Sequence, residues 1–135
     1  MKTITLTRSE LIWETRHNTW TEEDWNNLLK WMKETIEDSN EHEESYWRKK
    51  NKAAYDVLKD LTWEQAVAEF DKGYEGLSWQ VDNSYKDSQG NLVPSSYKET
   101  VYELICEYMR EENYDQDVDE CNYADDFDEN FVIGD

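Results

Sequence analysis

Residues 97–109, YKETVYELICEYM, carry the clearest helical pattern in the chain. Their apolar and aromatic side chains recur every three or four residues, the spacing of one face of an α-helix. Pro94 precedes the stretch, and Ser96 with Glu99 has the spacing of a capping box, so the predicted helix begins near residue 96. We expect it to run to about residue 112, with an apolar face made of Tyr97, Val101, Leu104, Ile105, Tyr108 and Met109.

Strand patterns lie upstream of this helix. Leu77, Trp79 and Val81 alternate with polar residues, and the turn-forming cluster at 87–91 separates them from Leu92 and Val93. This pattern predicts an antiparallel β-hairpin near 77–93, which Pro94 would end. Residues 3–7, TITLT, also alternate and contain β-branched side chains, so they predict an N-terminal strand.

Two further helices are predicted between these strand regions before residue 60. Thr21 with Asp24 resembles a capping box, and the helix that it opens should end near 38–40. Its expected core face consists of Trp25, Leu28, Leu29, Met32 and Ile36, extended by Trp31. The second helix spans 42–59, with Trp47, Ala54, Tyr55 and Leu58 on its inner side.

A short helix should follow, opened by a capping box of Thr62 and Gln65 and ended by Gly73 in a left-handed conformation. Together these elements predict an α+β fold of about four helices with a small antiparallel sheet. The few glycines, the single proline and the lack of a repeat indicate one domain over 1–135. That domain would comprise a mixed body, 1–110, and an acidic segment, 111–135.

Residues 111–135, EENYDQDVDECNYADDFDENFVIGD, differ from the body in charge. They hold eleven acidic and no basic residues, so they supply −11 of the chain's net charge of −19. Aromatic and apolar residues recur among the acids, and we expect the segment to pack on the body through Phe127, Phe131 and Val132. Its predicted internal counter-charge is the basic cluster of Arg48, Lys49, Lys50 and Lys52, which should also pair with the acids around it.

Two other interpretations of this segment stay open. It could be a solvated acidic terminus that aids solubility. Alternatively, Asp115, Asp117 and Asp119 have the spacing of a calcium loop, with Asp126 at the twelfth position. Glu120 stands where that loop needs glycine, and Asp126 replaces the usual bidentate Glu. We therefore expect no metal and no cofactor.

The sequence does not predict an enzyme. His17 and His42 lie in no metal-binding or catalytic arrangement, and Cys106 and Cys121 have no CxxC or Cys/His spacing. No phosphate-binding or nucleophile motif is present. The longest apolar runs fall far short of the roughly 18 residues of a membrane span. The N-terminal residues MKTITLTRSE lack the apolar core of a signal peptide, so we expect a cytoplasmic protein, in the host cytoplasm if phage-encoded. A net charge of −19 would repel nucleic acid and anionic membranes, so the expected partner is a basic protein surface.

In size, acidity and aromatic content the chain, with seven Trp and nine Tyr, resembles the small acidic inhibitors that phages and mobile elements use against restriction enzymes and RNA-guided nucleases. The resemblance implies an anti-CRISPR or anti-restriction protein that mimics DNA, occupies the nucleic-acid channel of a defence nuclease and does no chemistry.

The expected partner-binding residues follow from charge density in the C-terminal segment. Its carboxylates would replace phosphates, and its aromatic residues would anchor the segment or stack in the partner's groove. The predicted residues are Asp115, Asp117, Asp119, Glu120, Asp125, Asp126, Asp128, Glu129, Tyr114, Tyr123 and Phe127. Trp20 and Trp47 are further candidates for exposed anchors. The alternative function is an immunity protein, or another acidic interaction module, that neutralises a basic partner.

Overall fold

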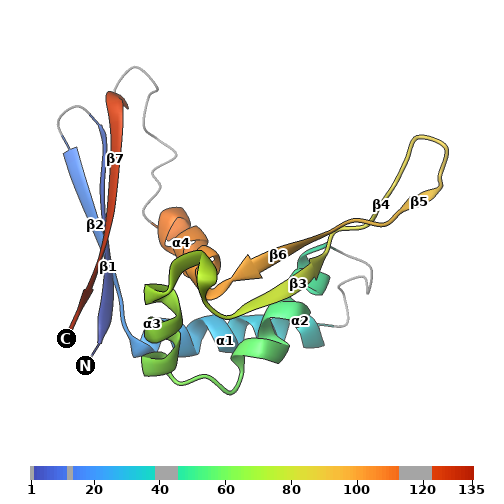
Figure 1. Cartoon of the computed structure of the whole chain (residues 1–135), viewed down its shortest axis with the longest axis horizontal. Helices are drawn as coiled ribbons and strands as arrows, with labels where there is room; N and C mark the ends of the chain where they lie inside the picture. Colours follow the sequence, from blue (N-terminus) through green and yellow to red (C-terminus); the bar gives the residue numbers. More distant parts are fainter. Residues whose placement is uncertain (1, 12–13, 39–45, 113–122) are drawn as a thin grey trace.

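A computed structural model describes residues 2–11, 14–38, 46–112 and 123–135 of the chain (Figure 1). It confirms the predicted α+β class. Four α-helices lie between a terminal sheet at one end of the molecule and a long hairpin arm at the other (Figure 1). The helices are α1 (Glu22–Glu37), α2 (Tyr46–Leu58), α3 (Trp63–Asp71) and α4 (Val101–Glu112), and a 3-10 turn, η1 (Gly73–Glu75), follows α3.

The terminal sheet joins the two ends of the described chain. Its strands are β1 (Thr3–Leu11), β2 (Glu14–Trp20) and β7 (Tyr123–Gly134), in the order β2-β1-β7. All neighbours are antiparallel, with Ile4 opposite Trp20 on β2 and opposite Ile133 on β7. The predicted N-terminal strand is therefore the central strand of this sheet. Its Ile4 and Leu6 side chains are fully buried.

The hairpin arm is longer than the sequence pattern predicts. Strand β3 (Ser78–Asp82) pairs with β6 (Ser96–Thr100), and the two-residue strands β4 (Tyr85–Lys86) and β5 (Leu92–Val93) pair farther out. The turn between β4 and β5 is closed by Asp87, whose carboxylate accepts the amides of Gln89 and Asn91, and by Gly90 at φ 83°. Pro94 lies within the arm and does not end it.

The start of α4 is therefore not the predicted one. Residues 96–100 form β6, where Tyr97 lies opposite Val81 and Glu99 opposite Trp79. The helix is capped instead by Thr100, whose amide donates to Glu103 Oε2 at 2.8 Å and whose hydroxyl accepts the Glu103 amide at 3.2 Å. The Ser/Thr-x-x-Glu spacing of a capping box occurs at Ser96/Glu99 and again at Thr100/Glu103. Residues 96–100 supply the backbone hydrogen bonds that β3 needs, so the helix begins at the second of these sites.

The other predicted caps are confirmed. Asp24 accepts the Thr21 amide at 2.8 Å, Gln65 accepts the Thr62 amide at 2.9 Å, and Gly73 has φ 62° after α3. One hydrophobic core connects all four helices with the terminal sheet and with β3 at the base of the hairpin arm. Its largest fully buried side chains are Trp20, Trp25, Ile4, Leu6, Met32, Leu58, Leu104, Ile105, Met109, Val67, Val81 and Val101.

Candidate partner-binding surfaces

The acidic C-terminal segment continues into a strand of the terminal sheet. Strand β7 pairs with β1 from Thr3 opposite Gly134 to Leu11 opposite Tyr123, with an irregularity between Ser9 and Leu11. The backbones of Tyr123, Asp125, Asp126, Phe127 and Asp128 lie on this strand, while their side chains fall outside the described part of the structure. The predicted residues Tyr114, Asp115, Asp117, Asp119 and Glu120 also lie outside the described residues.

Glu129 is the one predicted binding residue whose side chain is described, and it lies in an ion-pair cluster between the strand and α4. Its carboxylate accepts hydrogen bonds from Arg110 Nη2 at 2.6 Å and from Arg110 Nε at 3.0 and 3.1 Å, and it lies 3.5 Å from Arg8 Nε. The hydrogen bonds that Arg110 donates to Glu129 raise the pKa of Arg110. Arg110 also lies 5.9 Å from the Phe131 ring centre.

Phe131 fixes the same strand to the body from its apolar side. Its ring is 5.6 Å from that of Phe70 on α3 and 6.2 Å from that of Tyr102 on α4. Val132 is 52% exposed and does not share this role. Among the described side chains, the packing of the segment is carried by Phe131 together with Ile133. The Phe127 side chain, which was also expected to pack, lies outside the described part.

The basic cluster of α2 pairs within the body and supplies none of the described counter-charges of β7. Lys50 is buried and lies 2.8 Å from Glu107 Oε2 and 3.7 Å from Glu99 Oε1. Lys49 pairs with Asp82 at 3.3 Å, and Arg48 donates to the Ile36 carbonyl at 3.1 Å. The prediction that this cluster counters the tail is wrong for Glu129. Its partners are Arg8, which the β1–β7 pairing brings opposite it, and Arg110 of α4.

Two carboxyl groups that pair with this cluster have pKa values shifted in opposite directions. Burial, with the charges of Glu107 and Glu103 adding to it, raises the pKa of Glu99 to about 7 although Lys50 lowers it. Hydrogen bonds from Ser84, and then Lys49, lower the pKa of the exposed Asp82 to about 2. Glu99 Oε2 is buried without a hydrogen-bond partner.

An open groove of about 420 Å³ lies between α1, α2 and α4. Trp31, Trp47 and Tyr108 provide its aromatic surface, and a second hollow of about 330 Å³ adjoins it at Trp31 and Tyr108. Trp31 is 45% and Trp47 56% exposed. Both were expected on core faces, and this is wrong for both. The alternative that Trp47 is exposed is confirmed, while its role as an anchor for a partner stays a prediction. Trp20, the other candidate anchor, is 2% exposed and belongs to the core.

The groove is acidic. Asp38, Glu107 and Glu111 line it, and no Lys or Arg is among its described lining residues. Burial, followed by the charges of Glu107, Glu111 and Glu99, raises the pKa of Tyr108, so its phenol stays neutral. Sequence periodicity alone does not reveal this site, because it places the tryptophans of α1 and α2 on the core faces of their helices.

Neither the described histidine nor the described cysteine forms a reactive arrangement. His17 is exposed on β2, with Nδ1 3.1 Å from the Thr7 hydroxyl. Burial raises the pKa of Cys106 to about 11, which keeps its thiol protonated and unreactive. Within the described part of the chain, no group of three or more His, Cys, Asp or Glu residues is arranged to hold a metal ion. His42 and Cys121 lie outside that part.

None of the helices in the described ranges combines the length and apolar content needed to cross a membrane. Comparison of the chain with known protein families, with characterised proteins and with solved structures gives no match.

Proposed function

We propose that this protein is a non-enzymatic inhibitor that binds the basic nucleic-acid-binding surface of a defence nuclease, either a restriction enzyme or an RNA-guided nuclease. The observation that carries the proposal is the state of the acidic C-terminal segment. Residues 123–134 form a strand that pairs antiparallel with β1, regularly from Asp128 to Gly134, and is tied to α4 through Glu129. A backbone fixed before binding loses less conformational entropy on association than a free tail does.

The acids of that strand are concentrated in a short span. Asp125, Asp126 and Asp128 lie within four consecutive positions of β7, at the irregularity in its pairing with β1. Such a dense group of acids supplies the negative charge that attracts a phosphate-binding basic surface. Glu129 is already paired with arginines, so in this proposal it positions the strand.

The allocation of basic residues also supports an acidic surface. Arg8, Lys49, Lys50, Lys72 and Arg110 each form an ion pair with an acid of the same chain. These five basic side chains are therefore neutralised within a molecule whose net charge is −19. Such a field accelerates encounter with a basic partner and disfavours nucleic acid, and both effects weaken with salt.

An inhibition assay tests the proposal. The protein is titrated against DNA cleavage by a panel of restriction enzymes and RNA-guided nucleases, at several DNA and salt concentrations. For at least one nuclease we expect inhibition that is competitive with DNA. For that nuclease, replacing Asp125, Asp126 and Asp128 by Asn should raise the inhibitor concentration needed about tenfold.

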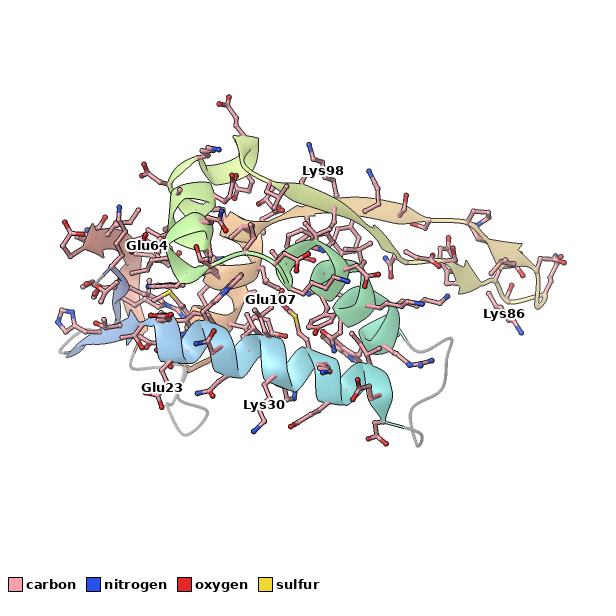
Figure 2. All side chains as sticks on the ribbon, turned by 90° about the horizontal axis from the view of Figure 1, so that it is seen from below. Glu23, Lys30, Glu64, Lys86, Lys98 and Glu107 are labelled. Carbon is pink, nitrogen blue, oxygen red and sulfur yellow. The ribbon has the colours of Figure 1, made fainter. Side chains whose placement is uncertain are left out.

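The matched control replaces three exposed acids on other elements, Glu22, Glu64 and Glu75, by Gln; Glu64 is labelled on α3 in Figure 2. Both triple variants remove the same charge. Equal loss of inhibition in the two would show that net charge alone acts, and inhibition that added DNA cannot relieve would exclude mimicry.

The second candidate is an immunity protein or other acidic module that caps a basic protein partner. The groove with Trp31 and Trp47 favours it, since exposed tryptophans are typical anchors of protein interfaces. Inhibition lost in Trp31→Ala and Trp47→Ala but retained in the β7 triple variant would support this alternative.

A further inference from the structure

The groove between α1, α2 and α4 combines two features that recognise organic cations. Its aromatic surface comes from Trp31, Trp47 and Tyr108, and the Trp31 and Tyr108 rings meet edge to face at 6.0 Å. Carboxylates of Glu107 and Glu111 line the same space. A cation held against indole rings and beside carboxylates gains both cation–π and Coulomb energy.

The Trp47 ring already receives a cation of its own chain. Lys50 Nζ lies 5.6 Å from the ring centre while it pairs with Glu107. With 56% of Trp47 still exposed, the ring retains surface for a second ligand.

Asn51 is an unsatisfied polar residue at the wall of the groove. It lines the groove, is only 2% exposed, and its Nδ2 is buried without a hydrogen-bond partner. Buried amide groups in folded proteins almost always have a partner, because an unpaired one costs roughly 1–3 kcal/mol. Since Nδ2 is closed to solvent, a ligand in the groove reaches it only if the Asn51 side chain turns outward.

We propose that this groove binds an arginine side chain presented by a basic segment of a protein partner. The guanidinium stacks on Trp31 and Trp47 and pairs with Glu111. Arginine suits the site better than lysine, because its planar group stacks on aromatic faces and is weakly hydrated. The identity of the partner rests on the proposed function, whereas the chemistry of the groove does not.

The charge of the groove argues against other occupants. Carboxylates of Asp38, Glu107 and Glu111 would repel the phosphates of a nucleic acid. A second copy of this chain would bring another net charge of −19. An arginine-bearing segment is the occupant with complementary charge and a planar group for the indoles.

Titration calorimetry with the full chain and three short acetylated, amidated peptides tests the inference. The peptides share the sequence Gly-Xaa-Gly-Xaa-Gly, with Xaa as arginine, lysine or uncharged citrulline. We expect the arginine peptide to bind most tightly, the lysine peptide several-fold more weakly and the citrulline peptide not measurably. The double variant Trp31→Ala/Trp47→Ala should weaken arginine-peptide binding about tenfold, and Glu111→Gln about threefold.

The controls carry the same substitutions elsewhere. Tyr85→Ala removes an exposed aromatic residue from the hairpin arm, and Glu64→Gln an exposed acid from α3. Both should bind like the wild type. Equal affinity for the arginine and lysine peptides would overturn the stacking geometry, and equal weakening in the controls would overturn the site. Self-association lost in the tryptophan variant, measured by sedimentation, would assign the groove to a second copy instead.

These outcomes are distinguishable from failure of the proposed function. The peptide experiment depends on the groove alone, and the nuclease experiment depends on β7.

Discussion

Two ion-pair clusters connect distant parts of this chain, and they have opposite ratios of acidic to basic side chains. At Glu129 one carboxylate lies between two arginines, Arg8 of β1 and Arg110 of α4. At Lys50 one ammonium group lies between two carboxylates, Glu99 of β6 and Glu107 of α4. The single acid of the first cluster has two basic partners, whereas the two acids of the second share a single base.

The difference shows which acids of this strongly acidic protein are buried with too little counter-charge. The side chains of Lys50 and Glu99 are 8% and 5% exposed, so water screens neither of them well. Because Lys50 is shared, it does not offset the burial of Glu99, whose pKa is raised to about 7. Glu99 is thus the member of the Lys50 cluster whose pKa lies near neutral pH.

Removing the shared base should have the largest effect. Lys50→Met leaves Glu99 and Glu107 without their common counter-ion, and we expect the free energy of unfolding at pH 7.5 to fall by about 4 kcal/mol. Chemical denaturation measures the loss. The control is Lys52→Met, which removes an exposed lysine two positions along the same helix and should change stability by less than about 0.5 kcal/mol. Similar losses of stability in both variants would mean that removing a positive charge from α2, and not breaking the buried cluster, lowers the free energy of unfolding.

The second effect is on pH dependence. Because the pKa of Glu99 is raised from 4.5 to about 7 on folding, the folded state binds its proton more tightly. Its contribution to stability is complete below pH 4.5 and is lost as pH rises through 7, by up to about 3 kcal/mol. Glu99→Gln cannot titrate, so its unfolding free energy relative to the wild type should rise between pH 4.5 and 8. Parallel pH profiles for the two proteins would contradict this assignment.

The smallest of the three effects is expected at the other cluster. Glu129→Gln removes the carboxylate between Arg8 and Arg110 but keeps a hydrogen-bond acceptor, and we expect a loss of about 2 kcal/mol. Chemical denaturation measures it, with the exposed Glu75→Gln as the control. Hydrogen exchange should show the loss as faster opening of the β1–β7 pairing. If the amides of β3 and β6 opened equally, Glu129 would stabilise the whole fold and not the terminal strand.

Several elements were predictable from local sequence because their signals act within a few residues. The caps at Thr21 and Thr62, the positive φ at Gly73 and the α+β class follow from side chain–backbone geometry and periodicity. Local signals were ambiguous at residues 96–100, which fit either a helix start or a strand. They also could not place Trp31 and Trp47, since a helical stripe shows which residues share a face but not how far its partners cover it.

The candidate surfaces show the same limit. Charge counts identified the C-terminal segment as the main source of negative charge, and its aromatic residues indicated that it packs on the body. They did not reveal that it pairs with β1, that Glu129 is held by arginines 19 and more than 100 positions away, or that an acidic aromatic groove lies on the helices.

The sequence by itself determined the net charge, the positions of most helix caps and the fold class, because composition and short-range spacing specify them directly. Only the tertiary structure decided which acids share a base and which tryptophans stay exposed. Those outcomes depend on strand pairing and helix packing between residues far apart in the chain, where Coulomb and packing energies act through space.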